Sequence, residues 1–83
     1  MAYTVYILES ERTGRYYVGS TGDLEERLAR HNQGRSKYTK ADVPWRVVYT
    51  EQVETRALAM RREQQIKRRK SRKYIEELVR TSR

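Results

Sequence analysis

Polar and apolar residues alternate along three short segments of the chain and recur with a helical period along three others. The alternating segments are rich in β-branched and aromatic residues, which predicts strands at about 3–8, 15–20 and 46–52. The helical pattern predicts helices at about 24–32, 56–70 and 72–80. Residues 11–14 supply a turn, so we expect the first two strands to pair as an antiparallel hairpin.

Residues that are typical of helix ends mark the limits of the predicted helices. Asp23 is followed three residues later by Glu26 in a capping-box pattern, and Gly34 is suited to end the same helix. Thr55 is placed to cap the second helix. Ser71 is placed to break that helix and to cap the third.

The predicted order of elements is β-β-α-β-α-α, which is typical of a small mixed α/β (α+β) fold. A chain of 83 residues makes one domain, so we expect residues 1–83 to form a single domain with a small core. There is no cysteine, which excludes disulfides and thiolate zinc sites and fits a reducing compartment. Neither a membrane-spanning segment nor a signal peptide is recognisable, so a cytoplasmic protein that does not enter membranes is expected.

Positive charge is concentrated in the last third of the chain. The formal net charge is +8, and the segment from Arg61 to Lys73 holds eight Lys or Arg residues and one acid. Charge gathered on one segment indicates a polyanionic partner, with nucleic acid the first candidate and an anionic membrane surface the second. The alternative is a solvated helix face without a partner.

Glu63 is the one acidic residue in that basic segment. It falls on the same face of the predicted helix as Ala59, Met60 and Ile66, which we expect to be buried. A carboxylate within an apolar stripe costs free energy unless another group pairs with it. Either an arginine neutralises Glu63 from within the fold, or Glu63 holds a cation.

Several residues resemble a known family when they are taken in order. Thr4-Val5-Tyr6 lies on the first predicted strand and Tyr17-Val18-Gly19 on the second. Arg27 and His31 lie four residues apart on the first helix, so both side chains point the same way, and Glu63 follows on a later helix. At these positions the chain resembles the GIY-YIG nuclease family, and most closely its small stand-alone bacterial members. It departs from the family name in having Thr-Val-Tyr for the first tripeptide and valine in the second.

The resemblance implies an architecture, an activity and roles for individual residues. We expect a GIY-YIG-like, three-stranded antiparallel sheet flanked by helices, and metal-dependent hydrolysis of phosphodiester bonds in DNA, directed by DNA structure rather than sequence. Glu63 would bind Mg²⁺ or Mn²⁺, Arg27 the scissile phosphate, and Tyr6 or Tyr17 would act as the general base or orient it. An unperturbed tyrosine titrates near ~10, so that role needs a pKa lowered by the metal or by nearby Arg and Lys. His31 titrates near ~6.5 and needs no such help.

Each of these residues also has a structural interpretation. The two tyrosines suit a small core, and His31 suits a helix surface beside a carboxylate. Arg27 is placed to pair with Asp23 or with Glu63, and Asn32 suits the end of a helix. On this interpretation the chain is a non-catalytic nucleic-acid-binding module on the same scaffold.

Two basic segments are candidates for contact with nucleic acid, and DNA is favoured over RNA. The predicted loop at 33–45 carries residues that suit stacking on and clamping of a strand: Arg35, Lys37, Tyr38 and Lys40. A disordered polar loop is the alternative for this segment. The second helix ends in a run that we expect to supply most of the non-specific affinity: Lys67, Arg68, Arg69 and Lys70.

Overall fold

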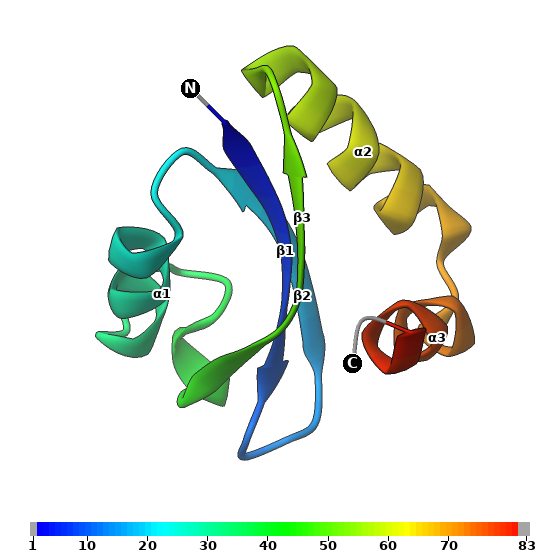
Figure 1. Cartoon of the computed structure of the whole chain (residues 1–83). Coiled ribbons are helices and arrows are strands. Elements are labelled where there is room, and N and C mark those ends of the chain that lie inside the picture. Colours follow the sequence, from blue (N-terminus) through cyan, green and yellow to red (C-terminus); the bar gives the residue numbers. More distant parts are fainter. Residues whose placement is uncertain (1, 82–83) are drawn as a thin grey trace.

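The fold is a three-stranded antiparallel sheet with helices on both faces, as expected from the sequence. A computed structural model describes residues 2–81. The strands are β1 (Tyr3–Ser10), β2 (Tyr16–Thr21) and β3 (Trp45–Val53). The helices are α1 (Leu24–Asn32), α2 (Arg56–Arg69) and α3 (Arg72–Thr81), and a short 3₁₀ helix, η1 (Lys40–Asp42), precedes β3. Figure 1 shows α1 on one face of the sheet, and α2 and α3 on the other.

The strand order is β2-β1-β3, so β2 is an edge strand and β1 is central. The central position of β1 explains why successive residues along it are buried, because alternate side chains pack into a core on each face of the sheet. Val5 and Ile7 pack beneath α2 and α3, whereas Tyr6 and Leu8 pack on the side of α1. All four side chains are at most 1% exposed.

Each helix presents an apolar stripe to one of these two cores. On α1, Leu24 and Leu28 pack against the cluster that contains Tyr6 and Leu8. On α2, Ala59 and Ile66 are buried in the other cluster, and burying an isoleucine of this kind is worth about 1.5–3 kcal/mol. Met60 is 52% exposed, so the prediction that it shares the buried face is wrong.

The helix ends predicted from the sequence are confirmed by the hydrogen bonds of their caps. The Asp23 side chain accepts from the backbone N–H of Glu26 at 3.1 Å, at the start of α1. Thr55 and Ser71 play the same part for α2 and α3, each accepting from the backbone N–H three residues ahead at 3.1 Å. Lys70 adopts a left-handed conformation with φ of 47°, which turns the chain between the two helices. None of the helices described in residues 2–81 is long and apolar enough to cross a membrane.

The segment before β3 is ordered by hydrogen bonds within it and to the end of α1. Trp45 is 4% exposed, and its indole N–H donates to the carbonyl of Thr39 at 2.9 Å. The amide side chain of Asn32, the last residue of α1, accepts from the backbone N–H of Trp45 and donates to its carbonyl. Asn32 therefore ties the end of α1 to the start of β3, which explains its position near the helix end.

Candidate active site

An aromatic cluster fills the space between β1, β2 and α1. The ring centroids of Tyr17 and His31 lie 4.9 Å apart, and those of Tyr6 and Tyr17 lie 6.4 Å apart. Tyr17 also meets Trp45 edge-on at 6.4 Å. Tyr6 and His31 are 1% and 3% exposed, so both lie beneath the surface. The helical spacing of Leu24, Leu28 and His31 brings the histidine to this face, and the alternative interpretation of His31 as a surface histidine is wrong.

Gly19 allows the Tyr6 ring to lie directly on β2. The two residues are register partners in the antiparallel pair of β1 and β2. A Cβ atom on Gly19 would lie 2.6 Å from the Tyr6 hydroxyl oxygen and 2.7 Å from its ring carbon. Such an approach is far inside van der Waals contact, so the phenol can occupy this position only because residue 19 has no side chain.

A chain of hydrogen bonds joins Tyr6 to Thr39 through His31. The Tyr6 hydroxyl lies 3.3 Å from Nε2 of His31, and the hydroxyl of Thr39 lies 2.9 Å from Nδ1. Burial, followed by the charges of Arg27 and Arg30, holds the pKa of His31 below its usual value of 6.5. The imidazole is therefore neutral at pH 7, with one ring nitrogen free to accept a proton.

Tyr6 is not prepared for ionisation by the protein itself. Burial and the neighbouring Tyr17 raise the pKa of Tyr6 to about 12, and the positive charge of Arg27 opposes this only in part. Arg27 therefore does not by itself give Tyr6 the lowered pKa that the role of general base requires. The phenol is a proton donor at neutral pH, and His31 is the group with which it shares a proton.

Arg27 projects from α1 towards the end of β2 and is not neutralised there. Its Nε atom is buried and has no hydrogen-bond partner. None of the ion pairs found within residues 2–81 includes Arg27, so neither predicted pairing, with Asp23 or with Glu63, is present. A buried guanidinium nitrogen without a hydrogen-bond partner is rare in proteins, and the positive charge of Arg27 attracts an anion to this cleft.

Glu63 lies on α2 at the border between the core and the surface. Its carboxylate accepts from the Ser20 hydroxyl at 2.7 Å and from the Lys67 ammonium at 2.6 Å. The side chain is 18% exposed, so one edge of the carboxylate is open to water. The pairing with Lys67 replaces the internal partner that the sequence suggested, and Ser20 was not anticipated at all.

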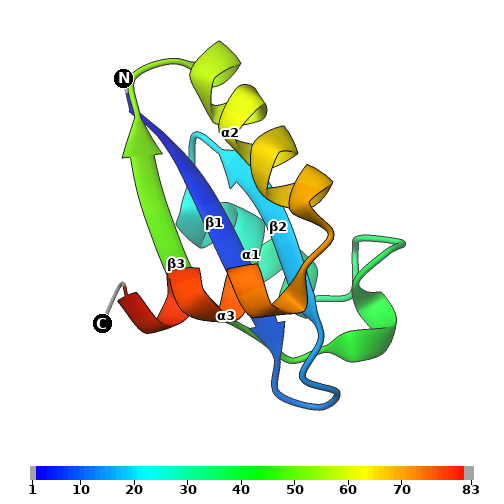
Figure 2. The same ribbon diagram turned by 90° about the vertical axis from the view of Figure 1, so that its right-hand side faces the viewer.

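The two charged residues converge although their helices lie on opposite faces of the sheet. Arg27 and Glu63 line one cleft of about 330 Å³, whose wall is formed by Ser20, Thr21 and Gly22 at the end of β2. Because β2 is an edge strand, a side chain from each face can reach around its end. Figure 2 shows this end of β2 beside α2, with α1 behind the sheet. A cation at one side of a cleft and a carboxylate at the other suit a phosphate and a metal ion.

The donor set around Glu63 fits a hard divalent ion with few protein ligands. Within residues 2–81 no three His, Asp or Glu side chains converge on a metal position. Mg²⁺ and Mn²⁺ are commonly held by one or two carboxylates, waters and substrate phosphates, so a lone Glu63 in a largely polar cleft is compatible with them. The Ser20 hydroxyl would orient the carboxylate.

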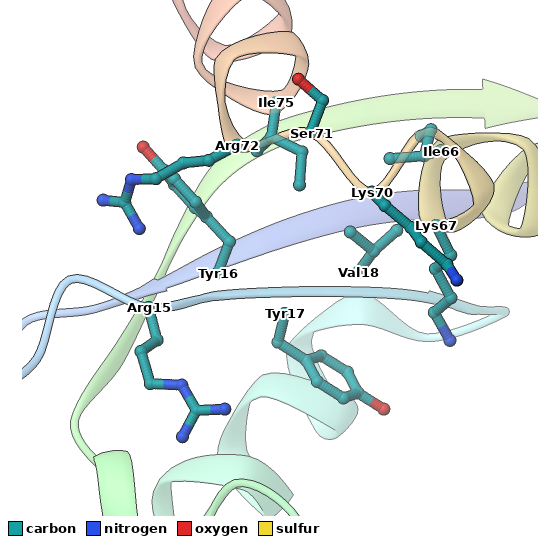
Figure 3. A pocket seen from close by; sticks show the side chains of 10 residues that line it. All are labelled: Arg15, Tyr16, Tyr17, Val18, Ile66, Lys67, Lys70, Ser71, Arg72 and Ile75. Carbon is teal, nitrogen blue, oxygen red and sulfur yellow. The ribbon is translucent and has the colours of Figure 1, made fainter.

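The predicted nucleic-acid-binding residues fall on different surfaces. Lys67 and Lys70 line a second groove beside β2, together with Arg15 and Arg72 (Figure 3). Arg69 lies elsewhere, with its guanidinium 4.3 Å from the centre of the Tyr74 ring.

Arg68 does not line this groove. On the predicted loop, Tyr38 is 85% exposed and Lys37 and Lys40 are exposed beside it, while Arg35 donates to Gln33. The loop therefore presents an aromatic ring and positive charge to the solvent.

Sequence reasoning missed several residues that complete these sites. Ser20, Thr39 and Arg56 are small or ordinary polar residues with no spacing that marks them, and they become visible only through their distant partners. Arg72 carried a usable signal, because it lies in the basic segment from Arg61 to Lys73.

Comparison with known proteins identifies the family in which this arrangement occurs. A sequence model described as the GIY-YIG catalytic domain matches residues 2–75. The chain belongs to the GIY-YIG family. The matched region covers β1 through the first turn of α3, and so includes both tripeptides, Arg27 and Glu63. The resemblance inferred from the sequence is confirmed, and it implies a nuclease family.

Relatives of similar size share the same scaffold. A UPF0213 protein of Streptococcus pneumoniae is 42% identical over 67 residues, which are 80% of this chain and 67% of the relative. A UPF0213 protein of Staphylococcus saprophyticus is 39% identical over 77 residues, 88% of this chain and 93% of the relative. The solution NMR structure of a UPF0213 protein from Bacillus halodurans has 38% identity and a TM-score of 0.60, covering 98% of this chain and 85% of that one. The chain thus resembles small stand-alone GIY-YIG proteins.

Proposed function

We propose that the protein is a divalent-metal-dependent endonuclease that hydrolyses phosphodiester bonds in DNA. One observation carries the proposal: Arg27 and Glu63 reach one cleft from opposite faces of the sheet without pairing with each other. If these charges served only stability, a direct ion pair between them would be expected, whereas Nε of Arg27 is buried without a hydrogen-bond partner. Held apart, they leave room for a phosphate and its counterion.

In this proposal Arg27 binds the scissile phosphate and Glu63 holds the cation. A guanidinium forks onto two phosphate oxygens and cannot lose its proton, so it stabilises the added negative charge of the transition state. Mg²⁺ or Mn²⁺ bound at Glu63 would supply Lewis-acid polarisation of the phosphate and stabilisation of the leaving oxygen. Ser20 keeps the carboxylate oriented through its 2.7 Å hydrogen bond.

Proton transfer is assigned to Tyr6 and His31 as a pair. The phenol has a pKa of about 12, which argues against Tyr6 as an ionised base on its own. The neutral imidazole can take the phenolic proton at Nε2 while the Tyr6 oxygen accepts one from the attacking water. Tyr17 contacts the imidazole ring and holds it in place, and Thr39 fixes the other nitrogen.

The substrate is proposed to be recognised by shape and charge. The cationic residues Arg56, Lys67 and Lys70 lie along the side of α2 that flanks β2, where they line the two cavities. Contacts of this kind bind phosphates and carry no base information. This supports selection by DNA structure rather than sequence.

A second candidate function is a non-catalytic nucleic-acid-binding module. The near-complete burial of Tyr6 and His31 favours it, because both residues also serve the core. The two candidates differ in one respect that is simple to measure. A binding module retains DNA without breaking it, whatever metal is present.

The test is cleavage of a panel of end-labelled DNA structures by the purified protein and by Glu63→Gln. We expect cleavage of at least one branched, flap, nicked or single-stranded substrate with Mg²⁺ or Mn²⁺, none with EDTA, and none by Glu63→Gln. The substitution keeps the shape and the hydrogen bond from Ser20 but removes the charge that a cation needs. Full activity of Glu63→Gln rules out the metal role, and intact DNA under every condition favours the binding module.

A further inference from the structure

A groove lined by cations lies next to the catalytic cleft, between β2 and the junction of α2 with α3. It has a volume of about 440 Å³, and the residues that line it include no carboxylate. Figure 3 shows Lys67 and Lys70 at one end, and Arg15 and Arg72 at the other. Such a lining is complementary in charge to a phosphodiester backbone.

The four cations differ in how far the protein already satisfies them. Arg72 lies over the Tyr16 ring, with 4.8 Å between guanidinium and centroid, and donates to the carbonyl of Gly14 at 3.1 Å. It also pairs with Glu76, just as Arg15 pairs with Asp42 at 3.4 Å.

The two lysines are less constrained than the arginines. Among residues 2–81, Lys70 forms no ion pair. Lys67 has a single partner, Glu63, and its side chain is 42% exposed. The positive charge at the lysine end of the groove is therefore less neutralised by protein groups than the charge at the arginine end.

Lys67 links the two cavities, because it lines the groove and its ammonium binds Glu63, which lines the catalytic cleft. Glu63 and Lys67 lie four residues apart on α2, and Lys70 directly follows the helix, so this side of α2 runs from the catalytic cleft at Glu63 to the groove at Lys67 and Lys70. In the protein alone, the Lys67 ammonium sits 2.6 Å from Oε2 of Glu63. A divalent cation held by the Glu63 carboxylate would have to compete with this ammonium. A metal ion and the ammonium cannot share that oxygen, because like charges at this distance repel strongly.

We propose that the groove binds a backbone phosphate of the nucleic acid, and that Lys67 moves from Glu63 to that phosphate. The movement frees the carboxylate for the divalent cation, so nucleic acid and metal each favour binding of the other. The proposal rests on the metal role assigned to Glu63 above. A lysine side chain with four rotatable bonds makes such an exchange without any change in the backbone. Coupling of the two ligands is then reciprocal, as linkage requires.

The first test measures Mn²⁺ binding to the protein without DNA, by electron paramagnetic resonance of the free ion. Lys67→Met keeps the alkyl stem but removes the competing ammonium, so Mn²⁺ should bind about five- to tenfold more tightly than to the parent. Lys70→Met is the matched control, because it removes the same charge three residues further along the chain, just past the end of α2. At physiological salt its effect should stay below about twofold.

The outcomes separate this proposal from the metal role itself. Equal gains in Lys67→Met and Lys70→Met overturn the proposal, because they reveal only the loss of general positive charge. If Glu63→Gln still abolishes Mn²⁺ binding in that case, the metal role stands. If neither the parent nor Lys67→Met binds Mn²⁺, both ideas fail together.

The second test measures binding of a labelled DNA oligonucleotide in EDTA, over a range of salt concentrations. Lys67→Met and Lys70→Met should each reduce the slope of log affinity against log salt by about 0.7–0.9, the contribution of one phosphate contact. Arg68→Met is the control, because that residue does not line the groove. Slopes reduced equally by all three substitutions would overturn the phosphate site in the groove.

Discussion

Tyr6 and Gly19 face each other across the pair formed by β1 and β2, and the fit between them sets the position of the phenol. The fit is local and leaves no room for even one carbon atom, since a Cβ on Gly19 would approach the Tyr6 oxygen to 2.6 Å. The same phenol lies 3.3 Å from His31. A single methyl group on β2 should therefore disturb the proposed path of the proton.

Gly19→Ala should displace the Tyr6 ring and slow cleavage more than it weakens DNA binding. Overpacking of this kind costs about 1–3 kcal/mol of unfolding free energy, which urea titration measures. Gly22→Ala is a comparison in the wall of the same cleft, because its methyl group would meet a Tyr3 ring carbon at 3.3 Å and would leave the Tyr6 hydroxyl untouched. Unchanged stability and cleavage in Gly19→Ala would show that the Tyr6 ring can move aside and that its close approach to residue 19 is not needed for cleavage.

His31 should make the stability of the protein depend on pH in the mildly acidic range. The pKa of His31 is lowered in the folded state. Between the lowered pKa and about pH 6.5, the unfolded chain therefore binds a proton at His31 that the folded protein does not bind. The contribution of neutral His31 is complete above that pH and is lost as pH falls towards the lowered pKa. Urea unfolding at pH 8 and pH 5.5 should show a larger loss for the parent than for His31→Gln.

Glutamine is the appropriate replacement at position 31 because it can hydrogen-bond to both Tyr6 and Thr39 but does not titrate. An equal loss of stability in the two proteins would contradict a depressed pKa at His31. The rate of cleavage supplies a second readout. If Nε2 accepts the proton, the rate should rise with pH through the lowered pKa and level off near neutrality.

At the scale of the elements, the sequence was informative wherever structure is set by neighbours along the chain. Alternation identified each strand, and the caps at Asp23, Thr55 and Ser71 identified the helix starts, because these signals act over two to four residues. The loop before β3 gave no such signal. Its order comes from contacts such as that between Thr39 and Trp45, which have no local pattern.

The candidate site likewise combines features that the local sequence predicts with features that depend on distant contacts. The motif residues were recognisable from their order, but their surroundings were not. Helical spacing placed Glu63 on the face of Ala59 and Ile66, yet it did not reveal that this face extends past an edge strand, where Lys67 and Ser20 become the partners. That outcome depends on the strand order β2-β1-β3, which a single sequence does not state.

The loop that carries Tyr38 should contribute to DNA binding without supporting the fold. Its ring is 85% exposed, so Tyr38→Ala should change the free energy of unfolding by less than about 0.5 kcal/mol. Loss of a stacked base costs about 1–3 kcal/mol, which corresponds to a roughly five- to hundredfold weaker complex in fluorescence anisotropy. Tyr38→Phe, which keeps the ring, should bind as the parent does. Normal binding by Tyr38→Ala would remove the loop from the interface.

For the whole molecule, the residues that attract nucleic acid differ from the residue proposed to act in the reaction. Most of the net charge of +8 comes from the segment between Arg61 and Lys73, which provides a general electrostatic attraction for a polyanion. Arg27 is one of nineteen Lys and Arg residues, so it adds little to this general attraction. Its location beside Glu63, with Nε buried and unpartnered, is the reason to assign it a role in the reaction.

The central claim is tested most directly by measuring DNA binding and DNA cleavage together for Arg27→Ala. Arg68→Ala is the control, because it removes the same charge from a residue outside both cavities. The account predicts that Arg27→Ala folds, binds DNA within about twofold of the control, and cuts about 10²–10⁴ times more slowly. Equal losses of binding and cutting, or cutting as fast as that of Arg68→Ala, would contradict it.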